Sequence, residues 1–204
     1  EVVCLDNLAS GMRVNVPAAA AFVEMDIRSD AVEDLIAAGH FDCVAHLAAQ
    51  IDVRRSVAEP RFDADVNILG GINLLEACRK HGVKKFIFSS TGGAIYGQPA
   101  SLPASEETPP APECHYAASK LAFEGYIQLY QRLYGLPYTI LRFPNVYGPR
   151  QRADGEAGVC SILAGLMLRG QQPTLYGFGE PLRDYVFAGD IARGCRSEEH
   201  TSEL

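Results

Sequence analysis

Short apolar segments of strand length alternate with longer helix-like segments along the chain, and this order constrains the fold more than any other feature. Strand patterns occupy residues 1–5, 22–25, 43–47, 85–89 and 138–142, with a short one at 174–176. Helix patterns begin at Asp30 and occupy residues 60–81, 116–134 and 156–169. Strands that alternate with helices predict a parallel sheet with crossover helices. The predicted fold class is therefore α/β, a doubly wound parallel sheet.

Local signals mark where these elements begin and end. Asp30 and Glu33 have the spacing of a capping box, and Gly39 stands past the expected end of that helix. Gly82 and Gly135 are expected to end the two long helices. The stretch 98–112 is too rich in proline for a helix and predicts a surface loop.

The composition excludes several classes of protein. The chain has 204 residues, of which 48% are hydrophobic and 21% are charged, and its net charge is −7. A negative balance argues against a nucleic-acid or anionic-membrane surface. No apolar run approaches the ~20 residues that span a bilayer, and no signal peptide opens the sequence, so we expect a cytoplasmic protein.

The cysteines and histidines give no sign of a metal or a disulfide framework. Six cysteines are scattered without a CxxC pair, and the five histidines lack the spacing of metal ligands. Scattered cysteines favour reduced thiols in a cytosolic protein over disulfides or a zinc site. We therefore expect no metal in this protein.

Two short segments carry the chemistry. Tyr116 and Lys120 stand four residues apart and so share one face of a predicted helix. A fixed Lys charge favours the phenolate and lowers a phenol pKa that starts near ~10, so such a tyrosine can act as a base. Ser89, Ser90 and Thr91 add hydroxyls where the preceding strand would stop. Together these groups can take a proton from a carbinol while a nicotinamide takes the hydride.

By itself, the Tyr–Lys spacing also fits a buried tyrosine and a solvated lysine. The segments on either side of it favour the proton-transfer chemistry instead. The segments SSTGGAIYG at 89–97, YAASK at 116–120 and LRFPNVYGPRQ at 141–151 follow one another in this order. In this order the sequence resembles the extended short-chain dehydrogenase/reductase family, in particular its NAD-dependent epimerases and dehydratases, and most closely the UDP-glucose 4-epimerases. The resemblance covers residues 1–193. It implies a Rossmann-like NAD-binding domain at 1–150 and part of a substrate-binding region at 151–195.

The resemblance implies NAD as the cofactor. Asp6 and Asn7 would hold the adenosine ribose, and an acid at that place disfavours the 2′-phosphate of NADP. A turn after an edge strand is the alternative for Asp6 and Asn7, and a solvated helix position is the alternative for Asn67. By resemblance, the residues that contact NAD are Asp6, Asn7, Asp26, Ile27, Leu47, Ala48, Ala49, Asn67, Ser89, Tyr116 and Lys120.

The resemblance also implies a UDP-sugar as the substrate. Arg183 would clamp the diphosphate through its planar fork of donors, although an ion pair with Asp184 or Glu180 is an alternative. Ser90 is a rival of Thr91 for the active-site hydroxyl, because this strand end has one residue more than the shorter family form. The residues implied in substrate contact are Ser90, Thr91, Asn145, Thr174, Tyr176 and Arg183, and the catalytic ones are Thr91, Tyr116 and Lys120.

The implied function is NAD-dependent epimerisation at C4 of a UDP-sugar, through a transient 4-keto sugar, with UDP-glucose and UDP-galactose as the pair. A UDP-glucuronate 4-epimerase, a dehydratase and a decarboxylase are alternatives. Dehydratases place an Asp–Glu pair after the threonine, where this chain has Gly92 and Gly93, which counts against elimination. A non-catalytic sensor of NAD or of a sugar nucleotide with the same fold is a further alternative.

Both ends of the sequence raise expectations of their own. In dinucleotide-binding folds an acid such as Asp6 stands about 20 residues beyond a Gly-rich phosphate loop. No such loop pattern occurs in the sequence, so we expect the loop and the first strand upstream of residue 1. Residues 196–204 match a translated sequencing adapter and are expected to be non-native and outside the fold. A chain truncated in this way is expected to be inactive by itself.

The helix at 116–134 carries more apolar positions than one buried stripe of about 100° can hold. One face can pack on the sheet, and the other is expected to meet a second copy of the chain. The helix at 60–81 is its expected neighbour in that contact, so the sequence predicts a homodimer.

Overall fold

The computed structural model describes residues 1–153, 158–175, 177, 180 and 182–199. All of its paired strands are parallel and alternate with helices, which confirms the predicted α/β class. The strands are β1 (Val3–Asp6), β2 (Ala21–Glu24), β3 (Cys43–His46), β4 (Lys85–Thr91), β5 (Tyr138–Phe143), β6 (Asn145–Tyr147) and β7 (Tyr185–Phe187).

The helices lie in the segments between these strands. They are α1 (Ala31–Gly39), α2 (Val53–Ala58), α3 (Pro60–Ala64), α4 (Gly70–Lys80), α5 (His115–Tyr134), α6 (Val159–Leu168) and α7 (Ala188–Glu198). A short 3-10 helix, η1 (Arg13–Asn15), follows β1, and a π-helix, η2 (Asp65–Leu69), joins α3 to α4. The predicted helix at 60–81 thus exists as three consecutive parts.

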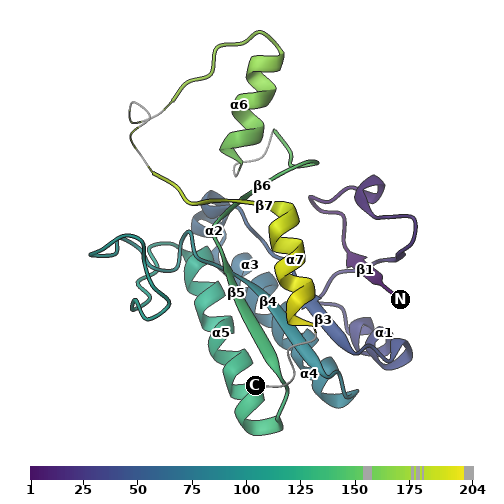
Figure 1. Ribbon diagram of the computed structural model, residues 1–204. Helices are drawn as coiled ribbons and strands as arrows, with labels where there is room; N and C mark the ends of the chain where they lie inside the picture. Colours follow the sequence, from purple (N-terminus) through teal and green to yellow (C-terminus); the bar gives the residue numbers. More distant parts are fainter. Residues whose placement is uncertain (154–157, 176, 178–179, 181, 200–204) are drawn as a thin grey trace.

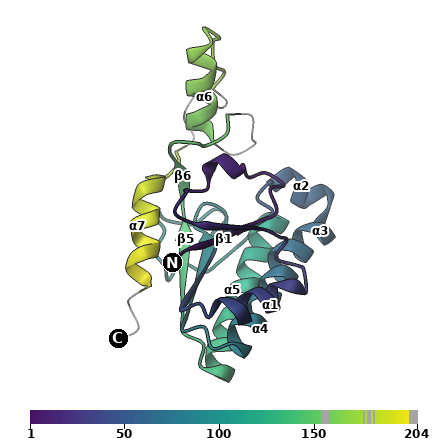
Figure 2. The same cartoon turned by 90° about the vertical axis from the view of Figure 1, so that its right-hand side faces the viewer.

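The described strands form three hydrogen-bonded groups. Strand β4 lies between β3 and β5, β1 pairs with β2, and β6 pairs with β7. Helix α7 covers one face of the β3–β4–β5 sheet, while α1, α4 and α5 lie on the other face (Figure 2). This arrangement of a parallel sheet between two helical layers is the one that the alternating sequence pattern predicts (Figure 1).

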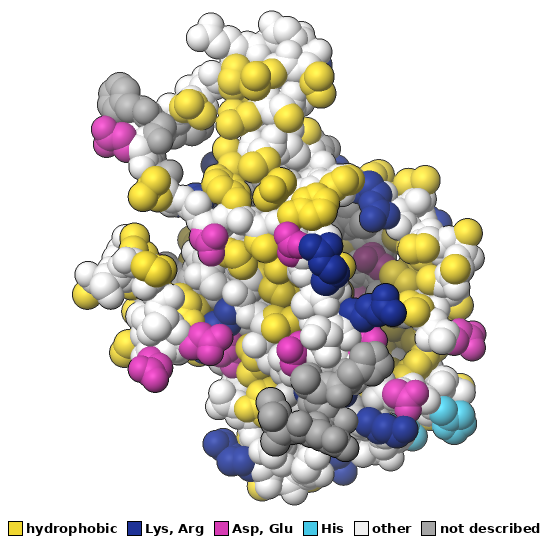
Figure 3. Space-filling view, viewed as in Figure 1, with side chains coloured by type: hydrophobic (Ala, Val, Ile, Leu, Met, Phe, Trp, Pro, Cys, Tyr) yellow, Lys and Arg dark blue, Asp and Glu magenta, His cyan; other side chains and the backbone are white. Residues whose placement is uncertain are grey.

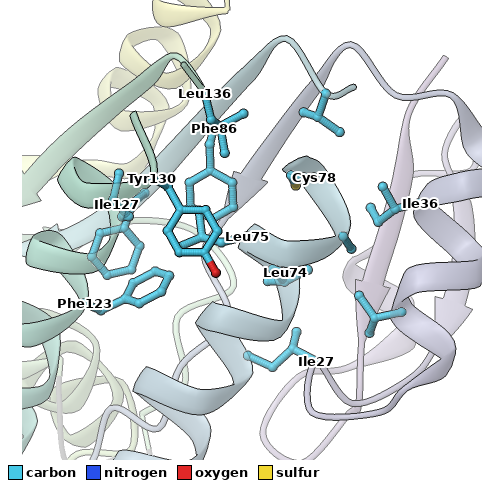
Figure 4. Packing of buried hydrophobic residues seen from close by; sticks show 14 residues of the cluster. Ile27, Ile36, Leu74, Leu75, Cys78, Phe86, Phe123, Ile127, Tyr130 and Leu136 are labelled. Atoms are coloured by element: carbon cyan, nitrogen blue, oxygen red, sulfur yellow. The ribbon is translucent and has the colours of Figure 1, made fainter. Parts of the chain in front are cut away.

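Aromatic rings fill the space between β4 and α5. The Phe88 and Phe123 rings meet edge to face with their centroids 4.9 Å apart, and the His46 ring lies within 6 Å of both. Leu74, Leu75 and Cys78 of α4 and Val32 and Ile36 of α1 continue this core toward β2, as Figure 4 shows for most of these side chains. The packed core therefore fixes α5 against the central strand.

The predicted capping box of α1 is wrong. Asp30 has helical backbone angles, φ −60° and ψ −27°, and its side chain makes no cap hydrogen bond. The Glu33 carboxylate lies instead 2.7 Å from the Lys80 ammonium on α4. Gly39 is the last helical residue rather than the residue past the end, because His40 takes the left-handed conformation at φ 47°. The Glu33 side chain, which the sequence assigned to the cap, therefore forms an ion pair between two helices instead.

Several elements of the second half differ from the sequence prediction. Thr174 belongs to no strand, and Tyr176 lies outside the described residues. The strands β6 and β7 were not predicted, and neither was helix α2 in the first half of the chain. Strands of three residues, such as β6 and β7, are too short for a period-2 pattern to identify.

Helix α7 also includes part of the segment expected to lie outside the fold. It continues through Arg196 to Glu198, and the Thr139 hydroxyl on β5 donates a hydrogen bond of 3.0 Å to the Glu198 carboxylate. The expectation fails for these residues because a helix propagates readily once it has begun, and one side chain finds a partner on the sheet. The non-native origin of residues 196–204 stays a prediction.

Helix α6 projects away from the sheet and its covering helices (Figure 1). Hydrophobic side chains gather over it at the top of Figure 3, and Val159, Met167 and Leu168 are exposed. This helix belongs to the region 151–195 that the sequence assigns to substrate binding, and it presents an apolar surface within the described part of the chain.

Gly71 on α4 should be required by the packing of α5. A methyl group added there would lie 2.5 Å from the fully buried Phe123 ring, which has no space to move, so Gly71→Ala should lower the free energy of unfolding by about 1–3 kcal/mol. Urea denaturation followed by circular dichroism measures this change.

Gly194→Ala on α7 is the matched control. Outside its chain neighbours and the α7 backbone, no described atom lies within 4 Å of its added methyl group, so the better helix propensity of alanine should raise the free energy of unfolding by about 0.5–1 kcal/mol. Changes of the same sign in both variants would contradict this account of the α4–α5 contact.

Candidate active site

The predicted catalytic residues gather at the carboxyl end of β4. Thr91 is the last residue of this strand, and Tyr116 and Lys120 belong to the first turns of α5, which packs against it. Ligands of open α/β sheets bind outside the carboxyl ends of the strands. The location therefore fits a ligand site, and the chemistry depends on how these three side chains meet.

Tyr116 and Thr91 lie close enough for their side-chain hydroxyls to interact. Burial raises the pKa of the Tyr116 phenol to about 12, and the interaction with Thr91 and the Asp63 charge act on it with smaller and opposite effects. The expected lowering of the Tyr116 pKa by Lys120 is therefore wrong for the chain by itself. The physical reason is that the cost of desolvating the phenolate outweighs the favourable interaction with Thr91.

Lys120 is buried, which excludes the alternative of a solvated lysine. Its ammonium donates a hydrogen bond of 2.8 Å to the Ser89 carbonyl and lies 4.6 Å from the centre of the Phe88 ring. Burial lowers the pKa of Lys120 to about 8, and the charge of Asp63 opposes this shift. The ammonium thus lies beneath the end of β4, held by the strand that also carries Thr91.

Ser90 and Thr91, the two rivals for the active-site hydroxyl, meet different residues of α5. The Ser90 hydroxyl is buried and donates to the Glu124 carboxylate of α5, while the Thr91 side chain meets Tyr116. The geometry therefore favours Thr91 as the active-site hydroxyl, and the Ser90 side chain serves a buried polar network.

That network was not foreseen from the sequence. Glu124 is almost fully buried and accepts two hydrogen bonds from the Arg142 guanidinium on β5, at 3.1 and 2.7 Å. Arg142 also donates to the Tyr96 hydroxyl at 2.7 Å, in the loop that follows Thr91. Glu124 stands four residues beyond Lys120 on α5, so the helical spacing was the available signal.

Asn67 lies in the π-helix η2 and is buried, which excludes the alternative of a solvated helix position. Its side chain accepts from the Gln50 N–H at 2.9 Å and donates to the Gln50 carbonyl at 3.0 Å. It therefore contacts the backbone beyond β3. Asp63, which accepts hydrogen bonds from the Asn67 and Gln50 side chains, was missed.

The predicted ribose site follows β1. The Asp6 carboxylate accepts a hydrogen bond of 2.7 Å from the Leu8 N–H, and Asn7 donates to the Asp26 carboxylate at 2.9 Å. Hydrogen bonds from Arg28 keep the pKa of Asp26 below its usual range. Asp6 and Asn7 thus lie at the end of β1 and in the turn after it, with Asp26 beside Asn7. Arg28, which binds Asp26, was not predicted from the sequence.

The other predicted contacts of the cofactor differ in exposure. Leu47 is exposed, and Ala48 and Ala49 are half-buried where the chain leaves β3. The Ile27 side chain belongs to the hydrophobic core. Only the Ile27 backbone can therefore face a bound adenine, and the role of these four residues stays a prediction.

The predicted substrate residues are only partly brought together. Asn145 begins β6, and a methyl group added at Gly93 would lie 3.8 Å from its amide nitrogen, so Asn145 stands beside the loop after Thr91. Thr174 and Arg183 are exposed on the chain between α6 and β7. The Arg183 guanidinium donates to the Leu182 carbonyl at 2.7 Å. Their contacts with a substrate stay predictions.

Among the described residues there is neither a group of metal ligands nor a helix that could cross a membrane. Within residues 1–153, 158–175, 177, 180 and 182–199, no group of three or more His, Cys, Asp and Glu side chains could hold a metal ion. In the same residues, no helix has both the length and the apolar character needed to cross a membrane.

The parallel sheet, with Thr91 at the end of its central strand and Tyr116 and Lys120 on the adjoining helix, defines a protein of the short-chain dehydrogenase/reductase class. The sequence comparison agrees with this assignment. Residues 1–197 match the model of the NAD dependent epimerase/dehydratase family, and the chain belongs to that family.

Relatives described as UDP-glucose 4-epimerases share most of this chain. A putative UDP-glucose 4-epimerase of Methanocaldococcus jannaschii is 47% identical over 193 residues, which cover 95% of the chain and 63% of the relative. The crystal structure of Thermus thermophilus UDP-glucose 4-epimerase in complex with NAD has a TM-score of 0.94 and 48% identity, covering 100% of the chain and 68% of that structure.

The UDP-glucose 4-epimerase of Thermotoga maritima, solved with UDP-glucose, has a TM-score of 0.91 and 46% identity, covering 94% of the chain and 63% of that structure. The chain spans less than two thirds of the length of the curated relatives it matches. The activity, substrate and partners of the whole protein are therefore matters for proposal.

The Glu124–Arg142 pair should contribute strongly to stability. Glu124→Ala leaves Arg142 partly buried without its counter-charge and should lower the free energy of unfolding by about 3 kcal/mol. Chemical denaturation measures the loss. Asp42→Ala is the control, because its ion pair with Lys84 is exposed and such pairs contribute about 0–1 kcal/mol. Similar losses in the two variants would contradict the role given to Glu124.

Proposed function

We propose that the protein containing this chain interconverts UDP-glucose and UDP-galactose by NAD-dependent epimerisation at C4. The observation that carries the proposal is the meeting of Thr91 and Tyr116 at the carboxyl end of β4, with Lys120 held one helical turn further along α5. Relatives that share 46–48% of its residues over most of this chain are described as UDP-glucose 4-epimerases, which supports the same substrate pair here.

The residues after β1 and β3 fit NAD as the cofactor. A side chain at Gly11 would come within 2.9 Å of the Asp6 carboxylate, so the glycine keeps that carboxylate open to ribose hydroxyls. An acid there repels the additional phosphate of NADP. The small side chains of Ala48 and Ala49 allow a flat ring to approach the backbone closely. When bound, NAD supplies the acceptor of the C4 hydride.

Tyr116 and Thr91 would handle the proton of the sugar 4-hydroxyl. Epimerisation needs this proton to leave and later to return, so Tyr116 must act first as a base and then as an acid. The raised pKa of Tyr116, about 12 because of burial, suits the return of the proton. Its removal calls for positive charge near the phenol, and Lys120 is the ammonium on the same helix face.

The loop after Thr91 supports epimerisation over elimination. Dehydration needs a further acid and base beyond the strand end. A side chain at position 92 would lie 2.8 Å from the Arg142 carbonyl, so only glycine fits there without a shift of the backbone. The backbone contact between β4 and β5 thus leaves no place for the acid of a dehydratase at this position.

A cytoplasmic location is proposed from the cysteines. All six are free thiols in the described part of the chain. Free thiols persist in reducing compartments, whereas oxidising ones favour disulfides.

Tyr116→Phe in the full-length protein should lower the turnover by about 10²–10⁴-fold, because the variant loses the group that carries the proton. Thr91→Ala should cost less, since it removes only an interaction with that group. Proton NMR of UDP-glucose conversion measures both rates, and calorimetry should find NAD binding in both variants. A Tyr116→Phe enzyme with normal turnover would reject the assignment, and a 4-keto-6-deoxy product or release of carbon dioxide would favour a dehydratase or decarboxylase.

A homodimer is the proposed assembly. Helix α5 buries Phe123, Ile127 and Tyr130 against the core, while another side of the helix exposes Tyr126, Leu129 and Leu133. Ala122, Gly125, Tyr126 and Leu129 line a shallow hollow on that side. Leu69 in η2, on the neighbouring helical segment, is also exposed. A second copy that packs its own α5 on this surface would cover these side chains.

Leu133→Glu should convert the dimer to a monomer at micromolar concentration, because a charge would enter the centre of an apolar contact. Light scattering of the full-length protein measures the mass. Leu168→Glu is the control, since Leu168 is exposed on α6, away from α5, and the variant should stay dimeric. A wild-type protein that is monomeric under these conditions would refute the proposed assembly.

A further inference from the structure

The chain that leaves β4 runs directly from the predicted active-site threonine. We call residues 92–97 the strand-end loop. Thr91 precedes this loop, and a methyl group added at Gly93 would lie 3.8 Å from the amide nitrogen of Asn145. The loop therefore lies between two residues that are expected to meet the substrate, and its conformation affects the shape of the site between them.

Backbone hydrogen bonds hold the strand-end loop near its two ends. The Gly92 N–H donates to the Phe143 carbonyl at 2.7 Å, which continues the pairing of β4 with β5 by one residue. The Ala111 N–H donates to the Ile95 carbonyl at 2.9 Å, and the Ile95 side chain is fully buried. Tyr96 is the residue of the loop whose side chain adds a third attachment.

This third attachment is made by Arg142 on β5. Its Nη1 donates to the Tyr96 hydroxyl at 2.7 Å, and the guanidinium carbon lies 5.2 Å from the centre of the Tyr96 ring. Its Nε and Nη2 donate to the two carboxylate oxygens of Glu124, at 3.1 and 2.7 Å. A planar fork of donors can bind a carboxylate and a phenol at the same time. Arg142 therefore joins the strand-end loop to α5.

Glu124 gives the Arg142 guanidinium one fixed orientation. The Glu124 side chain is 3% exposed, and it also accepts a hydrogen bond from the Ser90 hydroxyl. A bidentate pair of this kind fixes both groups in one geometry. Glu124 follows Lys120 by one turn of α5, so the helix that carries the catalytic residues also determines where the guanidinium lies.

We propose that Arg142 and Tyr96 are positioning residues, whose contact holds the strand-end loop against α5 so that the loop forms one wall of the sugar-nucleotide site. The effect on the substrate rests on the proposed function, because a UDP-sugar is the ligand expected beside Thr91 and Asn145. The effect on the loop conformation does not rest on it, since Glu124, Arg142 and Tyr96 meet within the chain itself.

Tyr96→Phe is the most direct test, because it removes the phenol oxygen and keeps both the ring and the Glu124–Arg142 pair. Amide hydrogen exchange of the full-length protein, followed by NMR, measures how often the loop opens. Exchange at Gly92 and Ala111 should become about 10-fold faster, as expected for the loss of one hydrogen bond to a charged group. Amides in the second half of α5 should exchange at the wild-type rate.

Tyr134→Phe is the matched control. The Tyr134 ring also lies beside an arginine, 4.8 Å from the guanidinium carbon of Arg79, but Tyr134 ends α5. It stands ten residues beyond Glu124, roughly 15 Å further along the helix, so exchange in the strand-end loop should not change. Loop exchange at the wild-type rate in Tyr96→Phe would overturn the proposal.

Arg142→Lys tests the same contact from its other side. Lysine keeps a positive charge for Glu124, but a single ammonium replaces the fork that reaches the carboxylate and the phenol together. If the two residues act through one contact, Tyr96→Phe should add no further acceleration of loop exchange to Arg142→Lys. Additive effects would mean two independent contributions and would overturn the proposal. If Arg142→Lys does not fold, the result for Tyr96→Phe decides.

Ligand measurements separate positioning from a general loss of structure. In Tyr96→Phe the KM for UDP-glucose should rise about 10-fold, because the wall of the sugar site is less often in place. The affinity for NAD, measured by calorimetry, should stay at the wild-type value. Equal losses of affinity for NAD and UDP-glucose would show a structural role only and would overturn the positioning role.

The exchange measurement needs neither NAD nor a sugar nucleotide, so the two proposals can fail separately. A protein that does not act on UDP-glucose, but whose loop opens more often in Tyr96→Phe, would refute the proposed function and leave the Arg142–Tyr96 contact standing. An active epimerase whose loop exchange is unchanged in Tyr96→Phe would refute this inference alone.

Discussion

The packing of α5 against β4 is the contact on which the rest of the site depends. The edge-to-face contact of the Phe88 and Phe123 rings fixes the distance and rotation of the helix relative to the strand. The hydrogen bond from Lys120 to the Ser89 carbonyl fixes its position along the strand. With both constraints in place, Tyr116 meets the hydroxyl at the strand end. A helix displaced by one turn would leave these side chains apart.

Burial shifts the pKa values of the two catalytic groups in opposite directions, up for Tyr116 and down for Lys120. It disfavours both the phenolate of Tyr116 and the ammonium of Lys120. The surrounding structure contains two buried carboxylates, which differ in their hydrogen-bond partners. Glu124 is satisfied by the Arg142 guanidinium and a serine hydroxyl, while Asp63 is hydrogen-bonded by the neutral side chains of Gln50 and Asn67. Both carboxylates therefore depend on residues outside the catalytic set.

Much of the fold could be predicted because the signals are local. The alternating apolar segments identify β1 to β5, and the glycines after α4 and α5 mark where those helices end. Arg28, Asp63 and Arg142 were missed because a charged residue in a sequence gives no sign of which other charge it will meet. The wrong capping box of α1 has the same origin, since Lys80 on a different helix binds Glu33.

The sequence by itself determined the α/β class, the family and the set of groups that can move a proton, because periodicity and motif spacing depend on neighbours along the chain. Only the tertiary structure decided which hydroxyl of β4 meets Tyr116, since that choice depends on where along the strand the first turn of α5 lies. It also decided the protonation tendencies of Tyr116 and Lys120. A pKa depends on how deeply a group is buried and on which charges surround it, and residues far apart in the chain provide both.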